Sequence, residues 1–247
     1  MSGEDDETVR IATWSGPRNI STAMMRSFEN RPDTDVVDEP FYGAFLAASR
    51  INHPMREEIL AGMETDPEAI GESLLSAQLP GRIHYQKHMT HHMLAGFPRD
   101  WISHVTNVFL IRDPCRVVAS YAAKRETVTF DDLGFGQQLE IFDTVAEHLG
   151  AAPPIVDADD VLRNPQAVLT LFCEACSISF CDEMLKWPAG PRASDGVWAA
   201  HWYGAVERST DFAPPVDSVP ELDGELSRLA DDARPAYEKL YALRMKI

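Results

Sequence analysis

The 247-residue sequence contains little cysteine, no long hydrophobic run and comparatively few basic residues. Four cysteines without a secretory segment favour reduced thiols over a disulfide framework. No uncharged stretch approaches the roughly 18 residues of a membrane-spanning helix. The first residues, MSGEDDE, are acidic where a signal peptide is basic. We therefore expect a soluble, cytoplasmic protein without membrane contact.

Acidic residues outnumber basic ones by 39 to 22, which gives a formal net charge of −17 with histidine neutral. This field repels polyanions, so we expect no nonspecific binding to nucleic acid. An anionic ligand must then be held by a local cluster of basic side chains and backbone N–H groups.

The C-x-x-C pair, Cys173 and Cys176, lies in a helical pattern without further ligands nearby. We interpret both residues as buried structural cysteines, and no metal site is predicted.

Strand-like and helix-like segments alternate along the chain, which is typical of a parallel sheet covered by helices on both faces. Strands are predicted at residues 8–14, 35–38, 82–86, 106–111 and 154–157. Helices are predicted at residues 20–28, 56–62, 66–77, 115–124, 135–149, 165–177 and 224–247, the last broken or kinked near Pro235. We expect one three-layer α/β/α domain over residues 1–247, with a flexible segment at 1–7 and a proline-rich loop at 212–220.

The turn after the first strand, SGPRNIST at residues 15–22, joins an apolar strand to a helix. Free backbone N–H groups and the helix dipole converge at such a turn, a geometry that suits a phosphate. The turn lacks the second glycine and the lysine of a Walker A sequence, which disfavours an ordinary ATP or GTP site. Arg18 and the hydroxyls of Ser21 and Thr22 can hold a phosphate instead. The alternative is a plain helix cap by Asn19 or Ser21, with a solvent-facing arginine.

A second motif, RDPCRVVAS, follows the strand at residues 106–111. It places Arg112 at the carboxyl end of a central strand and Ser120 on the next helix, and ligands of open α/β sheets bind at this edge. Together with the arginine turn, this pattern resembles the sulfotransferases that use 3′-phosphoadenosine 5′-phosphosulfate (PAPS), whose fold is like that of the P-loop NTPases. WSGPRNIST and VVDEPFY also resemble the branch that includes domains of plant branched-chain aminotransferase-like proteins.

The resemblance implies ligand roles for both motifs. The residues at the family's 5′-phosphosulfate positions are Arg18, Asn19, Ser21 and Thr22, and those at its 3′-phosphate positions are Arg112 and Ser120. Ile20 stands where many members have glycine, which leaves open whether donor binding is weakened.

The late part of the chain carries a weaker resemblance. Residues 155–176 are similar to a scaffold segment of the family. Residues 185–203 correspond to a region that supplies a basic loop to the 3′-phosphate in cytosolic sulfotransferases, and Arg192 is the comparable cation. The aromatic residues of this region are expected to pack in the core or against adenine: Trp187, Trp198, Trp202 and Tyr203.

Sulfuryl transfer needs a base for the acceptor and cationic groups near the leaving nucleotide. Lys87 and His88 are similar to the family's lysine and histidine, although the cytosolic enzymes place one residue between the two. The resemblance implies that His88 is the base and that Lys87 and Arg18 neutralise the transferring group from opposite sides. His91 and His92 are competing bases.

Glu39, after the second strand, is the rival base, because bacterial trehalose 2-sulfotransferase places a glutamate base at a comparable point. The structural alternative is that Asp38 and Glu39 cap the next helix, with Pro40 in its first turn. The sequence thus predicts a PAPS-dependent sulfotransferase that acts on a hydroxyl or amine of a small molecule, releases 3′-phosphoadenosine 5′-phosphate (PAP) and uses no metal. A P-loop small-molecule kinase and a non-catalytic nucleotide-binding protein are the alternatives.

Overall fold

The computed structural model describes residues 8–124 and 127–247, so the predicted flexible segment at residues 1–7 lies outside the described residues. Five strands form one parallel sheet in the order β2-β3-β1-β4-β5. Their bounds are β1 Val9–Ser15, β2 Thr34–Asp38, β3 Ile83–Met89, β4 Thr106–Ile111 and β5 Ile155–Asp157. The predicted strands and the α/β/α arrangement are confirmed, with small shifts at the strand ends.

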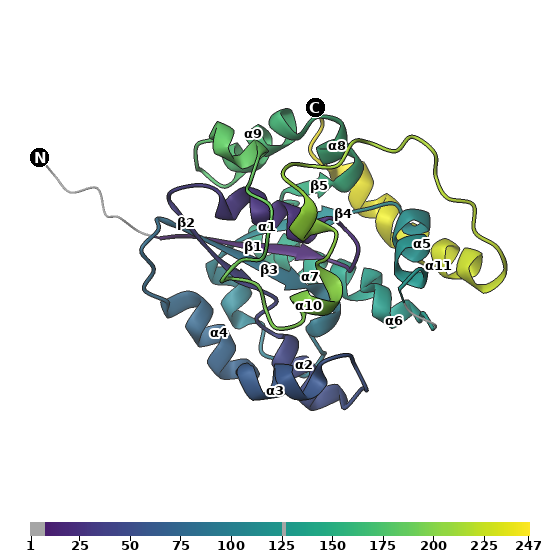
Figure 1. The fold of residues 1–247 in the computed structure, drawn as a ribbon, viewed down its shortest axis with the longest axis horizontal. Helices are drawn as coiled ribbons and strands as arrows, with labels where there is room; N and C mark the ends of the chain where they lie inside the picture. Colours follow the sequence, from purple (N-terminus) through teal and green to yellow (C-terminus); the bar gives the residue numbers. More distant parts are fainter. Residues whose placement is uncertain (1–7, 125–126) are drawn as a thin grey trace, which may run out of the picture.

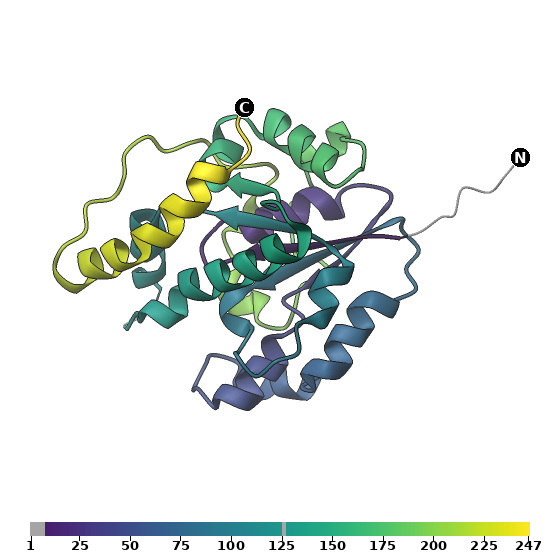
Figure 2. The ribbon, with the colours of Figure 1, turned by 180° about the vertical axis from the view of Figure 1, so that it is seen from behind.

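Helices cover both faces of this sheet (Figures 1 and 2). The α-helices are α1 Ser21–Glu29, α2 Tyr42–Ser49, α3 Arg56–Gly62, α4 Pro67–Ser76, α5 Pro114–Ala122, α6 Phe130–Leu133, α7 Phe135–Leu149, α8 Ala158–Arg163, α9 Pro165–Ala175, α10 Ala199–Trp202 and α11 Gly224–Leu243. Short 3-10 helices are η1 Thr90–His92, η2 Asp100–His104, η3 Asp182–Leu185 and η4 Val206–Arg208. In the part of the chain that is described, no helix is long and apolar enough to cross a bilayer.

Of the predicted break or kink near Pro235, the break is wrong, because α11 continues through this residue; the kink stays a prediction. Proline removes one backbone N–H from a helix and frees the carbonyl four residues earlier. Pro235 and Asp231 are both exposed, so water can bind that carbonyl. The buried side chains of Ala233 and Leu240 hold the helix against the protein. Residues 212–220, before α11, form a loop without helix or strand, as predicted.

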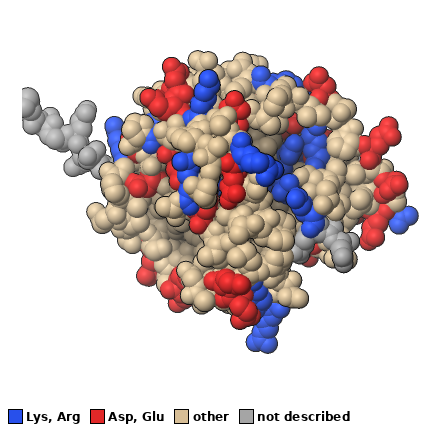
Figure 3. All heavy atoms as spheres, viewed as in Figure 1, with Lys and Arg blue, Asp and Glu red and all other residues tan. Residues whose placement is uncertain are grey.

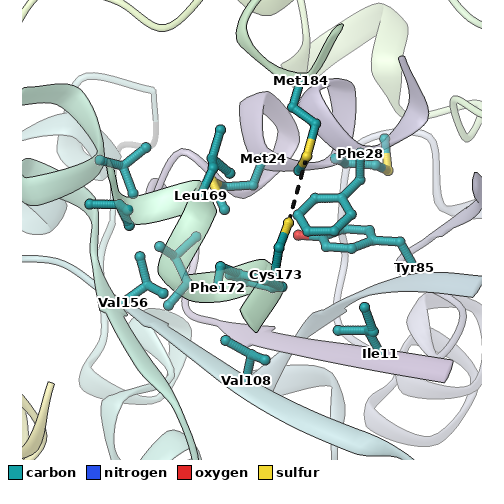
Figure 4. Packing of buried hydrophobic residues seen from close by; sticks show 14 of the residues in the cluster. Ile11, Met24, Phe28, Tyr85, Val108, Val156, Leu169, Phe172, Cys173 and Met184 are labelled. Carbon is teal, nitrogen blue, oxygen red and sulfur yellow. Dashed lines mark hydrogen bonds between the residues drawn. The ribbon is translucent and has the colours of Figure 1, made fainter. Parts of the chain in front are cut away.

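Two hydrophobic clusters occupy the two faces of the sheet, because successive residues of a strand point to opposite sides. One cluster packs β1 and β3 against α1 and α9, and Figure 4 shows Phe28, Tyr85 and Phe172 at its centre. Cys173 and Cys176 are buried in this cluster, as predicted. Burial raises the pKa of the Cys173 thiol to about 11. The other cluster contains Trp14, Phe41, Trp101, Phe109 and Phe142.

Candidate active site

The carboxyl ends of the parallel strands meet at one edge of the sheet, and most of the predicted site residues follow these ends. In strand order the edge carries Glu39 after β2, Lys87 near the end of β3, Arg18 after β1 and Arg112 after β4. Neighbouring strands lie about 4.8 Å apart, so the end of β2 is roughly 10 Å from that of β1. The candidate groups therefore lie in a row along this edge, with the turn that follows β1 in the middle.

The turn between β1 and α1 leaves the first N–H groups of α1 without a side-chain cap. The N-cap is Ile20, whose φ of 56° is left-handed. The predicted alternative of a cap by Asn19 or Ser21 is wrong: Ser21 is the first helical residue, and Asn19 Nδ2 donates to the Leu110 carbonyl at 3.2 Å. Asn19 ties the turn to β4. Left-handed backbone is easiest for glycine, so Ile20 adopts a conformation here that glycine would adopt at lower cost.

Arg18, Ser120 and Arg112 form one contiguous cluster. Arg18 Nε donates to Ser120 Oγ at 2.9 Å, and an Arg112 guanidinium nitrogen donates to the Arg18 carbonyl at 2.7 Å. Desolvation by burial lowers the pKa of both guanidiniums from the usual arginine value. Among the described residues, no carboxylate oxygen lies within 4.0 Å of either guanidinium. The cluster is thus a local positive site in a strongly acidic protein.

A cavity of about 360 Å³ opens beside this cluster. It is lined by α5, α8 and the 212–220 loop, through Arg112, Arg116, Ala119, Ser120, Asp159, Leu162, Val216, Ser218 and Pro220. In the space-filling view of this side, basic side chains gather around a hollow between the regions of α5 and α8 (Figure 3).

Arg116, which the sequence reasoning missed, fastens the loop over this cavity. Its guanidinium pairs with Asp159 Oδ2 at 2.8 Å and donates to the carbonyls of Val216 at 2.6 Å and Ser218 at 3.2 Å. The signal was its place in the RDPCR motif, one helical turn beyond Arg112.

Lys87 does not lie free at the edge, as a group that neutralises the transferring sulfuryl would have to do. Its Nζ donates to Asp38 Oδ1 at 2.8 Å, Glu39 Oε1 at 2.6 Å and the Tyr203 hydroxyl at 2.7 Å. An ammonium has three N–H donors, so all of them are used inside the protein. In this arrangement Lys87 holds Glu39, and its predicted action on the transferring group stays a prediction. Sequence reasoning also missed Tyr203 as part of this site.

Glu39 does not cap a helix, because α2 has Phe41 as its N-cap without a side-chain hydrogen bond. Its own φ of 47° is left-handed and turns its carboxylate toward Lys87. The Glu39 side chain is 11% exposed, against 1% for that of Asp38. Burial raises the pKa of Glu39, the nearby Asp38 carboxylate raises it further, and Lys87 opposes both. A buried carboxylate with enhanced proton affinity and some exposure is a suitable general base.

His88 lies on the opposite side of the sheet from Lys87, because adjacent residues of a strand point to opposite faces. Its ring stacks on Trp14 with centroids 4.5 Å apart, and it is 2% exposed. Burial lowers the pKa of His88 to about 3. The ring is enclosed by core aromatics, a setting that favours a neutral core residue, and the assignment of His88 as the base stays a prediction.

The other two predicted candidate bases, His91 and His92, lie on η1, beside Glu39. His92 is stacked on Tyr42 and Phe45, and its Nδ1 lies 3.9 Å from Glu39 Oε2. Burial lowers the pKa of His92 well below the usual value, which favours a neutral ring. His91 is half-buried, with its ring 4.4 Å from that of His92. His92 therefore borders Glu39, and His91 packs against His92.

Arg192 is not brought together with Arg112 or Ser120. Its guanidinium donates to the Pro188 carbonyl at 2.7 Å and has Nε 3.8 Å from Glu29 Oε2. Glu29 ends α1, whereas the phosphate-type turn precedes that helix. The late aromatics pack as predicted, with Trp187, Trp198 and Tyr203 buried and Trp202 half-buried.

The sheet order is that of a P-loop NTPase-like α/β domain, and two arginines lie at the carboxyl edge of the sheet. Residues 9–244 match the sulfotransferase domain family, and the chain belongs to this family. The relationship predicted from the motifs is thereby confirmed.

The chain is similar to two Arabidopsis thaliana proteins, branched-chain-amino-acid aminotransferase-like proteins 1 and 2. The sequence identities are 38% and 37%, and each alignment covers 83% of this chain. The chain spans only 37% and 36% of their lengths. A sulfotransferase from Alicyclobacillus acidocaldarius shares the fold with a TM-score of 0.56 and 13% identity, over 96% of this chain and 97% of that one.

Proposed function

We propose that this protein is a sulfotransferase that uses PAPS as donor and transfers the sulfuryl group to a hydroxyl or amine of a small molecule. The observation that carries the proposal is the pair of guanidiniums at the sheet edge, Arg18 and Arg112, each without a carboxylate partner among the described residues. In a chain of net charge −17, two such cations in one cluster favour a ligand with strong negative charge. A nucleotide with separate 3′- and 5′-anionic groups satisfies both.

The donor would lie across the ends of β1 and β4. Arg18, the first-turn N–H groups of α1 and the hydroxyls of Ser21 and Thr22 would hold the 5′-phosphosulfate. Arg112 and Ser120 would hold the 3′-phosphate, beside the cavity that Arg116 helps to line. Asn19 would contribute by fixing the turn through Leu110. The donor residues proposed are Arg18, Asn19, Ser21, Thr22, Arg112 and Ser120.

The acceptor would approach from the Glu39 side of the turn. Glu39 takes the proton of the acceptor hydroxyl or amine, whose oxygen or nitrogen attacks sulfur in line with the bond to the leaving phosphate. The new bond to sulfur forms as the S–O bond to the nucleotide breaks. Arg18 offsets the charge that develops on the leaving oxygen, and PAP departs. The proposed base, the transfer point and the 3′-phosphate site then lie one after another along the sheet edge, at the ends of β2, β1 and β4.

Ligand-induced thermal stabilisation tests the donor assignment. PAP at a hundredfold excess over its Kd should add about 2.7 kcal/mol of stability. Arg112→Ala should lose most of this gain. The matched control is Arg82→Ala, which removes an exposed arginine at the opposite edge of the sheet. If ATP with magnesium stabilises the protein more than PAP does, the proposal is contradicted in favour of a kinase. If PAP binds but labelled PAPS transfers no sulfuryl group to a broad panel of acceptors, a non-catalytic protein is favoured.

A further inference from the structure

Four polar side chains at the ends of β2 and β3 form a buried group, here called the carboxylate–lysine cluster: Asp38, Glu39, Lys87 and Tyr203. Two carboxylates face one ammonium in it, away from bulk water. His92 on η1 also faces Glu39, with Nδ1 3.9 Å from Oε2. Buried polar groups are costly unless their hydrogen bonds are made, so the position of each proton in this cluster matters.

The Tyr203 hydroxyl can donate its proton in only one direction. Its oxygen accepts from Lys87 Nζ at 2.7 Å and from Trp198 Nε1 at 3.2 Å, and both of these groups are donors only. These two bonds occupy both lone pairs of the phenol oxygen. Its own proton therefore goes to a carboxylate, and Asp38 Oδ2 at 2.7 Å is much closer than Glu39 Oε1 at 3.4 Å.

The two carboxylates of the cluster are consequently unequal. Asp38 accepts at both oxygens, from Lys87 at Oδ1 and from Tyr203 at Oδ2. Glu39 accepts only at Oε1. Within the described residues, Glu39 Oε2 accepts no hydrogen bond, and His92 Nδ1 at 3.9 Å is beyond hydrogen-bonding distance. Asp38 is closed on every side, whereas Glu39 keeps one oxygen open at the more exposed end.

We propose that Asp38 and Tyr203 are positioning residues that hold Lys87 on the closed side of the cluster and leave Oε2 of Glu39 to receive the acceptor proton. This inference rests on the proposed function. Without the Asp38 carboxylate, Glu39 would lose a neighbouring negative charge, and Lys87 would pair with Glu39 alone. Both changes lower the proton affinity of Glu39, so it would become a weaker base. Without Tyr203, Asp38 would lose a donor and draw Lys87 closer, so Glu39 would become a stronger base.

The pKa of Glu39 can be measured directly by NMR titration of protein labelled with ¹³C at glutamate side chains, with the Glu39 signal assigned from Glu39→Gln. Asp38→Asn should lower this pKa by about one unit or more, and Tyr203→Phe should raise it. In enzyme with measurable turnover, the acid limb of the pH–rate profile should shift in the same directions. A merely structural loss would move both variants alike.

The controls are Asp35→Asn, on the same strand, and Tyr237→Phe, which removes a hydroxyl that donates to Asp157 at 3.1 Å. Both should leave the Glu39 pKa unchanged. Shifts of Asp38→Asn and Tyr203→Phe in one direction, or no shift beyond that of the controls, would overturn the inference. If Asp38→Asn does not fold, Tyr203→Phe and its control decide alone.

Sulfuryl transfer from labelled PAPS to a panel of hydroxyl and amine acceptors separates the two ideas. Transfer by the wild type without the expected pKa shifts refutes the positioning roles and leaves the proposed function intact. The expected shifts without any transfer refute the proposed function, and with it the roles of Asp38 and Tyr203 in a reaction.

Discussion

Replacing His88 by phenylalanine should make the stability of the protein less sensitive to acid. In the folded state His88 is enclosed by Trp14, Phe41 and Trp101, and burial lowers its pKa to about 3, from an ordinary value of 6.5. The unfolded chain therefore binds a proton between pH 6.5 and 3 that the folded protein does not bind. Stability from this group is fully present above pH 6.5 and is lost as the pH falls toward 3.

The magnitude follows from the two pKa values. Between pH 7 and pH 5, His88 alone should reduce the free energy of unfolding by about 2 kcal/mol. His84, whose pKa burial lowers to about 4, acts in the same direction but is present in both proteins. The variant also loses the 3.2 Å hydrogen bond to Gln86 Oε1. That cost is the same at both pH values, so it cancels in the comparison.

The assay is urea denaturation of the wild type and His88→Phe at pH 7 and pH 5. The wild type should lose about 2 kcal/mol more than the variant on acidification, and the variant should retain sulfuryl transfer. Equal losses in the two proteins would refute the assignment of His88 as a neutral core residue, and abolished transfer in a folded variant would restore it as a candidate base.

Three further variants probe other contacts. Glu39→Gln should lower kcat by roughly 10²- to 10⁴-fold with PAP binding retained; steady-state rates and thermal shifts measure the two, and undiminished turnover would rule out Glu39 as the base. Arg116→Ala should make the 212–220 loop more sensitive to limited proteolysis, because it removes the bonds to the Val216 and Ser218 carbonyls; unchanged cleavage would argue against this fastening. Gly16→Ala should destabilise the protein by about 1–3 kcal/mol in urea denaturation, since a Cβ there would lie 2.5 Å from the Leu133 carbonyl oxygen; an unchanged midpoint would show that α6 can move away.

The fold could be predicted because alternating strand and helix patterns carry it locally. The strand at residues 106–111 contains the apolar run VFLI at residues 108–111, and the structure reproduces its bounds. Arg18 and Arg112 could be predicted as neighbours because Arg18 lies in the turn after β1, Arg112 follows β4, and parallel strands end at one edge. Pro235 was misjudged because solvent exposure of the freed carbonyl depends on tertiary packing.

The acid–base side of the site was harder to predict, since it depends on contacts between distant residues. Tyr203 lies 116 positions from Lys87, and no local pattern indicates that the two meet. The opposite orientations of Lys87 and His88 could have been read from their adjacency in a strand. Adjacent residues of a strand face opposite ways, whereas the one-residue spacing of the cytosolic enzymes puts both side chains on one face.

The opposite orientations of Lys87 and His88 also constrain how β3 can align with its neighbours. If β3 slipped by one residue, the Lys87 ammonium would enter the space between Trp14 and Trp101. No carboxylate of the described residues is shown there to pair with it. The imidazole would leave that space for the acidic pair at the end of β2. Misalignment is therefore penalised by an unpaired buried charge as well as by lost apolar contact, and the residues proposed for chemistry also help select the correct strand pairing during folding.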